Sequence, residues 1–232
     1  MRPIERFFSD AGQMERALAD EVAHRLGEAI SGRGRATFVA AGGTTPAAFY
    51  RELAARPLEW SRVTVVPSDE RWVPPTDPEA NIRLLREHLL TGPAAAAYAL
   101  PLADADSPEA ASLHADARLR EFWPPDAAVL GMGTDGHTAS LFPGGPECAA
   151  ALQPDAARLV AVRSAPLQSA ASTRLSLTAG ALLGSRWTAL LLRGSEKLET
   201  YRAALSGSDP ASMPVRVLWD RVTRPVQIFW AP

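Results

Sequence analysis

The residues best suited to chemistry lie in one glycine-rich segment, Asp126–Gly144. Its apolar beginning, Ala127–Leu130, predicts a short buried strand. Five residues that suit a ligand site follow that strand: Gly131, Gly133, Asp135, Gly136 and His137. Glycine permits sharp turns and the close approach of a ligand, and an imidazole can take up and return a proton near neutral pH. We therefore predict an active-site loop at the end of a strand.

The same glycines match the dinucleotide-binding fingerprint Gly-x-Gly-x-x-Gly. That fingerprint requires a long helix from its third glycine and an acidic residue about 20 positions further on. Pro143 follows seven residues after Gly136, which leaves space for only about two helical turns. Asp155 stands near the required distance, but no second predicted strand leads into it. We therefore do not expect nicotinamide binding.

Another candidate loop follows the predicted strand 36–41. It holds two glycines and two threonines, Gly42, Gly43, Thr44 and Thr45, immediately before Pro46. Glycine N–H groups, threonine hydroxyls and a helix N-terminus together favour phosphate binding. A plain turn in which threonine caps the next helix is the structural alternative. The loop is not a Walker loop, because the Gly-Lys-Ser/Thr ending is missing.

A further candidate loop, Ser68–Pro74, follows the predicted strand 63–66 and contains the charged residues Asp69, Glu70 and Arg71. A charged triplet is typical of a solvated turn. Trp72 and the prolines on either side favour a rigid, partly covered loop instead. The planar guanidinium of Arg71 would suit a phosphate or a carboxylate.

Predicted strands and amphipathic helices alternate along the chain and must position these loops. The predicted strands are 36–41, 63–66, 127–130, 159–162, 188–192 and 226–230, and the predicted helices are 10–31, a helix from Pro46, 81–90, 108–122 and 196–205. This order predicts βαβ units around a mainly parallel sheet. We expect one three-layer, doubly wound α/β domain over residues 1–232. Ligands of such sheets collect at the carboxyl ends of the strands, where all three loops fall.

The composition narrows the class of function. The chain has 232 residues and a net charge of −2, so we expect neither nucleic acid nor a membrane as a partner. No His or Cys stands at metal-ligand spacing from His137, and Cys148 is the only cysteine. The N-terminal segment lacks the apolar run of a signal peptide, and we expect a cytoplasmic protein. The sequence is compatible with a monomer or a small homo-oligomer.

Taken together, the motifs resemble the 6-phosphogluconolactonase family. The resemblance rests on Gly42–Pro46, Ser68–Pro74, Asn81 and Leu130–Gly144, followed in the family's order by Pro166 with Thr173–Thr178, Gly194–Lys197 and Met213–Leu218. It implies a fold similar to those of glucosamine-6-phosphate deaminases and ribose-5-phosphate isomerases. Three positions depart from the commonest pattern, since Ala41, Thr44 and Ala80 stand where serine is more frequent.

The resemblance implies hydrolysis of 6-phospho-D-glucono-1,5-lactone to 6-phosphogluconate in the oxidative pentose phosphate pathway, without a metal or organic cofactor. His137 would be the base that activates water and then returns the proton to the ring oxygen. Arg71 and loop N–H groups, such as those of Gly133 or Gly136, would stabilise the oxyanion. Either Asp135 or Asp69 would orient His137 or Arg71, and the sequence does not choose between them.

The phosphate would bind on the turn Gly42–Thr45, and Arg174 and Lys197 would supply positive charge. The expected substrate-binding residues are Gly42, Gly43, Thr44, Thr45, Asn81, Gly133, Arg174 and Lys197. We therefore predict a small phosphosugar lactone as the molecular partner.

Three other functions have to be weighed. A glucosamine-6-phosphate deaminase shares the glycine turn and the Asp-Gly-His loop but continues with a segment that supplies a carboxylate, whereas Ser140–Pro143 contains none. A ketose isomerase would need a carboxylate placed as the enediol base. A catalytically silent sugar-phosphate sensor is the alternative from a different class, and the presence of His137, Arg71 and Lys197 argues against it.

Overall fold

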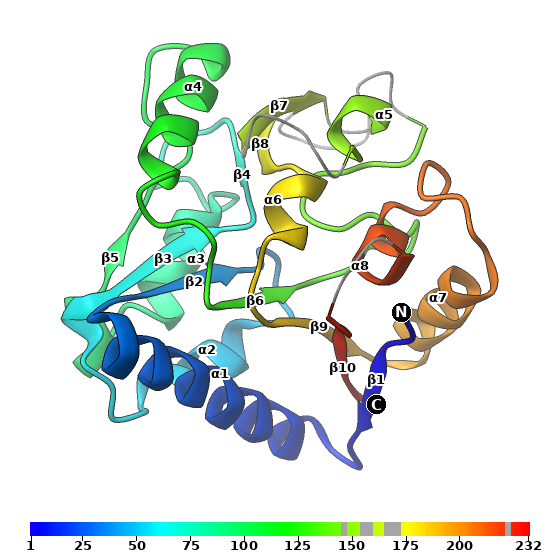
Figure 1. The fold of residues 1–232 in the computed structure, drawn as a ribbon, viewed down its shortest axis with the longest axis horizontal. Coiled ribbons are helices and arrows are strands. Elements are labelled where there is room, and N and C mark those ends of the chain that lie inside the picture. The colour runs from blue at the N-terminus through cyan, green and yellow to red at the C-terminus, as the bar shows by residue number, and fades with distance from the viewer. Residues whose placement is uncertain (145–147, 154–159, 165–172, 221–223) are drawn as a thin grey trace.

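A seven-stranded sheet forms the middle of the molecule (Figure 1). The computed structural model of the chain describes residues 1–144, 148–153, 160–164, 173–220 and 224–232. In spatial order the strands are β1 (Ile4–Phe7), β10 (Gln227–Ala231), β9 (Thr188–Arg193), β6 (Ala127–Leu130), β2 (Ala36–Ala40), β3 (Val63–Pro67) and β5 (Tyr98–Ala99). Every neighbouring pair in this sheet is parallel. The predicted parallel sheet is therefore confirmed.

The strand order reverses between β2 and β6. From β2 the chain adds β3 and β5 on one side, and from β6 it adds β9 and β10 on the other. The loops that leave β2 and β6 consequently diverge and open a crevice at the carboxyl edge of the sheet. Two of the three predicted functional loops flank this crevice.

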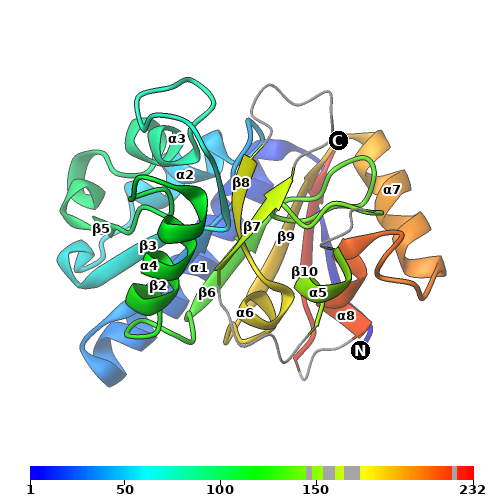
Figure 2. The ribbon, with the colours of Figure 1, turned by 90° about the horizontal axis from the view of Figure 1, so that it is seen from above.

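Helices cover both faces of the sheet (Figure 2). One face packs against α1 (Ala11–Arg33), α2 (Ala47–Ala54) and α3 (Asn81–His88), and the other packs against α4 (Pro108–Leu119), α6 (Ala179–Leu183), α7 (Ser195–Ser206) and α8 (Val217–Asp220). Alternate residues of one strand serve the two cores: Phe38 packs with the α1 and α2 side chains, whereas Val39 packs with those of α4 and α6. The three-layer α/β prediction is confirmed.

A small antiparallel sheet lies beside the main one, and the strand predicted near residues 159–162 belongs to it instead of to the parallel sheet. It consists of β4 (Asp69–Arg71), β8 (Thr173–Leu177) and β7 (Val160–Ser164), in that order. Leu175 and Leu177 join it to the core shared with α4 and α6. Its first strand has only charged residues, so no apolar alternation indicates a strand there. The charged triplet is thus a hydrogen-bonded strand instead of a solvated turn.

The glycine-rich segment after β6 contains no long helix. Its backbone runs through turns and one isolated bridge between Thr138 and Leu141. The next helix, α5, begins only at Cys148. The expectation that no dinucleotide-type helix opens at Gly136 is confirmed. Shorter 3-10 turns are η1 (Trp60–Arg62), η2 (Gly92–Ala96) and η3 (Pro214–Arg216).

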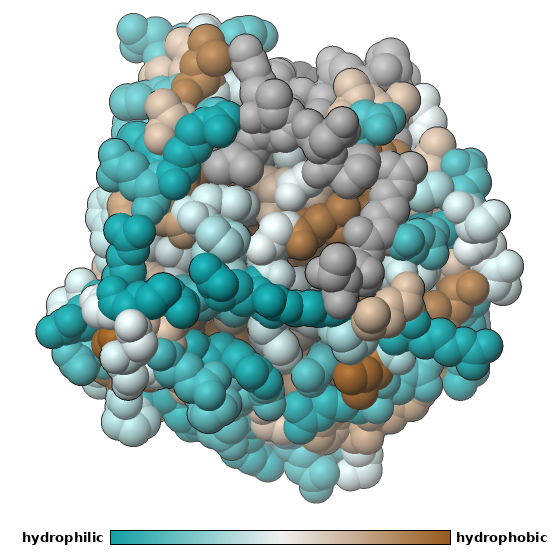
Figure 3. All heavy atoms as spheres, viewed as in Figure 1, coloured by the Kyte–Doolittle hydropathy of each residue, from teal (hydrophilic) through white to brown (hydrophobic). Residues whose placement is uncertain are grey.

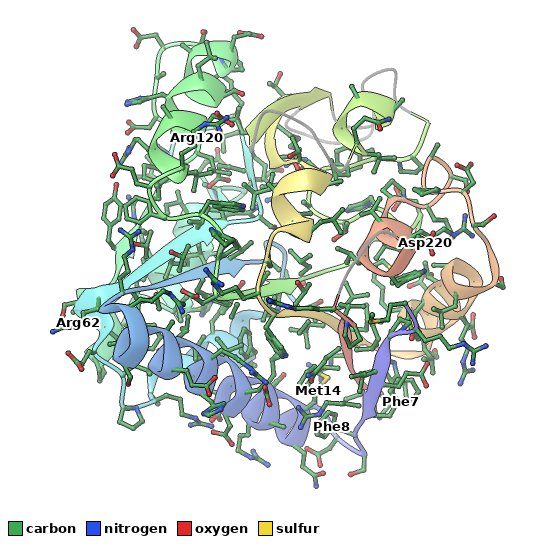
Figure 4. The ribbon with its side chains drawn as sticks, in the orientation of Figure 1. Phe7, Phe8, Met14, Arg62, Arg120 and Asp220 are labelled. Atoms are coloured by element: carbon green, nitrogen blue, oxygen red, sulfur yellow. The ribbon has the colours of Figure 1, made fainter. Side chains whose placement is uncertain are left out.

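Aromatic side chains fix the edge formed by β1 and β10. The ring centroids of Phe7 and Trp230 are 5.4 Å apart, and those of Phe8 and Phe229 are 5.9 Å apart. Figure 4 shows Phe7 and Phe8 at this edge with Met14 of α1 close by. Strand β1 was not predicted, because its four residues are too few to show a clear period.

The surface over α1 is mainly hydrophilic, as the lower part of Figure 3 shows. In the described part of the chain, no helix has both the length and the apolar character needed to cross a membrane.

Candidate active site

A cavity of about 370 Å³ lies at the crevice between the β2 and β6 loops. It is lined by the first loop (Gly42–Thr45), by Ser68, Asp69 and Arg71 after β3, and by Gly131, Gly133 and His137 after β6. The end of β9 and the beginning of α7 complete it with Arg193 and Lys197. The three loops predicted from the sequence therefore meet in one cavity. Among the described residues, no group of three or more His, Cys, Asp or Glu side chains is arranged to hold a metal ion.

The first loop presents unpaired backbone donors. The N–H groups of residues 42–45 donate to no acceptor in the described part of the chain. Helix α2 begins directly after them, and its N-cap Pro46 provides no side-chain hydrogen bond. The alternative in which a threonine caps this helix is therefore wrong. Free N–H groups beside the positive end of a helix form a site for an anion.

Two buried side chains hold this loop in place. The hydroxyl of Tyr50 donates to the carbonyl oxygen of Ala41 over 2.5 Å. Burial, reinforced by the nearby charge of Asp69, raises the pKa of Tyr50, which keeps the phenol protonated as a donor. Asn81 packs so closely against Gly42 that a Cβ there would lie 2.3 Å from Asn81 Oδ1. Gly42 is thus required by the approach of Asn81.

Glu70 has a structural position that the sequence did not reveal. Its side chain is 2% exposed, and its carboxylate accepts from the N–H groups of Arg71 (2.8 Å), Asn81 (2.7 Å) and Ile82 (2.7 Å). Burial raises the pKa of Glu70, although these three hydrogen bonds oppose the rise. Glu70 therefore caps α3 and fixes Asn81 next to the first loop.

Asp69 is the carboxylate that links two of the cavity loops. Its carboxylate accepts from Ser140 Oγ (2.6 Å), from Ser68 Oγ (3.0 Å) and, at 3.4 Å, from Asn81 Nδ2. These contacts connect the loop after β6 to that after β3. Asp69 thus organises the cavity wall, and its hydrogen-bond partners do not include His137.

Asp135 is the carboxylate that contacts His137. The imidazole Nδ1 lies 2.6 Å from Asp135 Oδ1, which also accepts from the His137 backbone N–H at 3.1 Å. Burial works against ionisation of Asp135, but the hydrogen bonds from His137 outweigh it and hold the pKa of Asp135 below its usual range. An ionised carboxylate requires a proton on Nδ1, so Nε2 is the nitrogen left to act as a base. The ring of Phe142 packs 4.9 Å from the imidazole.

Gly133 makes room for this pair. A Cβ at Gly133 would lie 2.1 Å from His137 Nδ1 and 2.4 Å from Asp135 Oδ1. The Gly133 N–H donates to His137 O (2.9 Å), and the Gly136 N–H donates to Gly133 O (3.1 Å). Because the turn uses both donors internally, the expectation that these two N–H groups stabilise an oxyanion is wrong. Gly133 accommodates the pair sterically.

Three cations line the cavity among the described residues: Arg71, Arg193 and Lys197. The guanidinium of Arg71 donates to the carbonyl oxygen of Glu79. Lys197 lies in the first turn of α7, as the sequence predicted. Arg193 was not predicted as a site residue. It lies two residues after the cavity-lining Leu191 on the same strand, so the two side chains face the same side of the sheet.

Arg174 lies behind the cavity wall. It pairs with Arg71 across β8 and β4, is 7% exposed, and does not belong to the described residues that line the cavity. Burial, followed by the charge of Arg71, lowers its pKa. Its role in substrate binding stays a prediction. Pro166, which contributed to the resemblance, lies outside the described residues.

Comparisons with known proteins agree with the fold. The chain belongs to the family described as glucosamine-6-phosphate isomerases/6-phosphogluconolactonase, which matches residues 9–230. The 6-phosphogluconolactonases of Rhizobium meliloti and Pseudomonas putida are each 43% identical to it, over 97% of this chain and over 97% and 91% of their own lengths. A crystal structure of a 6-phosphogluconolactonase from Shewanella baltica is 35% identical, with a TM-score of 0.94 over 100% of this chain and 98% of that one.

A monomeric glucosamine-6-phosphate deaminase shares the fold at 20% identity, with a TM-score of 0.79 over 98% of this chain and 97% of its own. This likeness confirms the expected fold similarity to the deaminases.

Proposed function

We propose that this protein is a 6-phosphogluconolactonase that hydrolyses 6-phospho-D-glucono-1,5-lactone to 6-phosphogluconate. The observation that carries the proposal is the contact of Asp135 with His137, which lines the same cavity as the first loop with its free N–H groups. One cavity thus combines a base with an anion site. The names of relatives that are 43% identical over nearly the whole chain support the same activity.

In the proposed reaction, His137 Nε2 takes a proton from water while the water oxygen attacks C1 of the lactone. The Asp135 carboxylate, 2.6 Å from Nδ1, stabilises the imidazolium that forms. The tetrahedral intermediate then collapses, the bond between C1 and the ring oxygen breaks, and the imidazolium returns the proton to that oxygen. The enzyme ends in its starting state, and one water has been consumed.

Arg71 is the group that we propose to stabilise the oxyanion on C1. Its guanidinium lines the cavity and is held by the Glu79 carbonyl oxygen, so it is oriented before the substrate arrives. A fixed cation near developing negative charge lowers the barrier without reorganising at the moment of reaction. The N–H groups of Gly133 and Gly136 are already used within their turn.

The phosphate is proposed to bind on the first loop, Gly42–Thr45, with Lys197 as a cationic partner. Asn81 supports the loop through its close approach to Gly42. For Arg174 we retain substrate binding as a proposal, supported by its position beside Arg71. Binding the phosphate away from C1 holds the lactone in position for attack.

The deaminase alternative requires a carboxylate in the segment after His137. Residues 140–143 contain none: Ser140 donates to Asp69, and Phe142 packs on the imidazole. A catalytically silent sensor would have no use for an ionised Asp135 bonded to His137. An activity assay distinguishes the deaminase and the sensor from the lactonase.

The test follows the decay of lactone generated from glucose 6-phosphate by its dehydrogenase, compared with the spontaneous rate. We expect clear acceleration by the purified protein, and a loss in kcat of about 10²–10⁴-fold in His137→Asn with the fold intact. Near-normal turnover by that variant would rule out the assignment of the base. A wild-type protein that does not accelerate decay would favour the sensor, and ammonia release from glucosamine 6-phosphate would favour the deaminase.

We further propose that residues 1–232 act as one cytoplasmic catalytic domain, in a monomer or a small homo-oligomer. The sheet supports a single domain, because β1 and β10 from the two ends of the chain pair within it. The net charge of −2 supports a small-molecule substrate in preference to nucleic acid.

A further inference from the structure

We propose that Arg193 is a second phosphate-binding cation, carried by β9 to the N-terminus of α2. This inference rests on the proposed function and adds to it a residue that selects phosphorylated lactones. Neither the family resemblance nor the sequence patterns assigned Arg193 any role.

The alternation of side chains along β9 places Arg193 on the correct face of the sheet. Ala189 and Leu191 belong to the core packed against α1 and α2, whereas Leu190 and Leu192 belong to the opposite core. Arg193, the last residue of β9, continues the first series. It therefore leaves the sheet toward the α1 and α2 layer and into the cavity, which it lines together with Leu191.

The first loop leaves the sheet toward the same layer. Phe38 and Ala40 of β2 belong to the core against α1 and α2, and Gly42 is the next residue in that alternation. The loop then runs directly into α2 at Ala47. Arg193 and the unpaired N–H groups of residues 42–45 thus reach the cavity from two strands on one side of the sheet.

A buried acid on α1 supports this placement. Glu15 is 9% exposed, and its pKa is raised by burial, while the charges of Arg193 and then of Arg51 counteract that rise. Glu15 is therefore near enough to interact with Arg193 and with Arg51 of α2.

The charges in the cavity show why a second cation is needed. A phosphate monoester carries about −1.5 to −2 charges at pH 7, and Lys197 supplies only one positive charge. Arg71 is tied to Glu79 on the opposite side of the crevice, where the reacting carbon is proposed to lie. Asp69 is the only carboxylate among the described residues lining the cavity. Arg193 with Lys197 matches a dianion, and its planar guanidinium suits phosphate oxygens.

The test compares Arg193→Ala with Arg202→Ala, a matched loss of an exposed arginine on α7. For each variant, kcat/KM is measured with the 6-phosphorylated lactone and with unphosphorylated glucono-1,5-lactone. We expect Arg193→Ala to lose about 10- to 100-fold on the phosphorylated substrate alone, the usual range for a charged hydrogen bond. Arg193→Lys should recover part of that loss, and Arg202→Ala should match the wild type.

Binding of 6-phosphogluconate and of gluconate by calorimetry gives a readout that is independent of turnover. Equal losses on both lactones, or none on the phosphorylated one, would overturn the role of Arg193. If Arg193→Ala is less stable, Arg193→Gln is measured in its place and judged by the same ratio. Absence of lactonase activity in the wild type, together with Arg193-dependent binding of 6-phosphogluconate, would refute the proposed function and leave the phosphate site standing.

Discussion

Replacing Gly133 by alanine should disable the His137–Asp135 pair without unfolding the protein. The new Cβ would lie 2.1 Å from His137 Nδ1, whereas ordinary contact begins near 3.4 Å. The imidazole must therefore retreat by more than ~1 Å, and a misplacement of that size costs about 10²-fold in rate. That loss corresponds to roughly 2.7 kcal/mol of transition-state stabilisation.

Gly131 supplies the matched control in the same loop. A Cβ at Gly131 meets no atom of the described residues within 4 Å, so Gly131→Ala adds the same methyl group without moving the imidazole. Initial rates with enzymatically generated lactone, corrected for spontaneous hydrolysis, give kcat and KM for both variants. We expect the loss in Gly133→Ala to fall on kcat. Gly131→Ala should keep its kcat, and any effect there should fall on KM, because Gly131 lines the cavity.

A double-mutant cycle makes the steric argument refutable. In a His137→Ala background no imidazole is left to displace, so Gly133→Ala should cost almost nothing further. The reasoning fails if Gly133→Ala alone keeps kcat within about threefold of the wild type. It also fails if Gly131→Ala loses as much, or if the cost of Gly133→Ala persists without His137.

Four more predictions concern other contacts of the site. Asp135→Asn should lower kcat about 10²–10⁴-fold by removing the carboxylate that orients His137. Because the pKa of Asp135 is lowered by folding, its ionised form should stabilise the wild type above about pH 4. That advantage over Asp135→Asn should disappear as the pH falls through the lowered pKa, which urea unfolding at several pH values measures. Glu70→Ala should cost about 2–4 kcal/mol of unfolding free energy, because three N–H groups lose their acceptor, and Glu70→Gln should cost less. Lys197→Ala should raise KM for the phosphorylated lactone more than Arg174→Ala does, since only Lys197 of the two is among the described cavity-lining residues.

Each of these has a clear contrary result. A stability difference for Asp135→Asn that grows in acid would contradict the direction of the pKa shift. Unchanged urea midpoints for Glu70→Ala would show that α3 does not depend on this cap. A larger KM effect at Arg174 than at Lys197 would place the phosphate near the small sheet.

The sequence predicted the main sheet well because its strands are apolar and separated by amphipathic helices. Ala127–Leu130 was predicted and found as β6 with the same bounds, and Ser195–Ser206 begins and ends within one residue of the predicted helix. The small sheet was not predicted because its strand Asp69–Arg71 contains no apolar residue that would indicate a strand. Its pairing with residues 173–177 depends on tertiary contacts across about a hundred residues of chain.

The candidate site was likewise predicted in part from the sequence. Residue types and glycine spacing indicated His137, and the loops were correctly expected to meet at the carboxyl edge. The choice between Asp135 and Asp69 required coordinates, because both are carboxylates that follow strands. The internal use of the Gly133 N–H also depends on the path of the backbone, which side-chain identities do not reveal.

The parallel pairing of β1 with β10 has a consequence for how the protein is made. Residues 4–7 leave the ribosome before the other described strands, whereas their strand partner, residues 227–231, emerges after all of those strands. During translation the β1 segment therefore has backbone N–H and C=O groups but no neighbouring strand with which to form hydrogen bonds. Strand β10 must then enter between β1 and β9, so closing this edge is a step that follows synthesis of the other described strands.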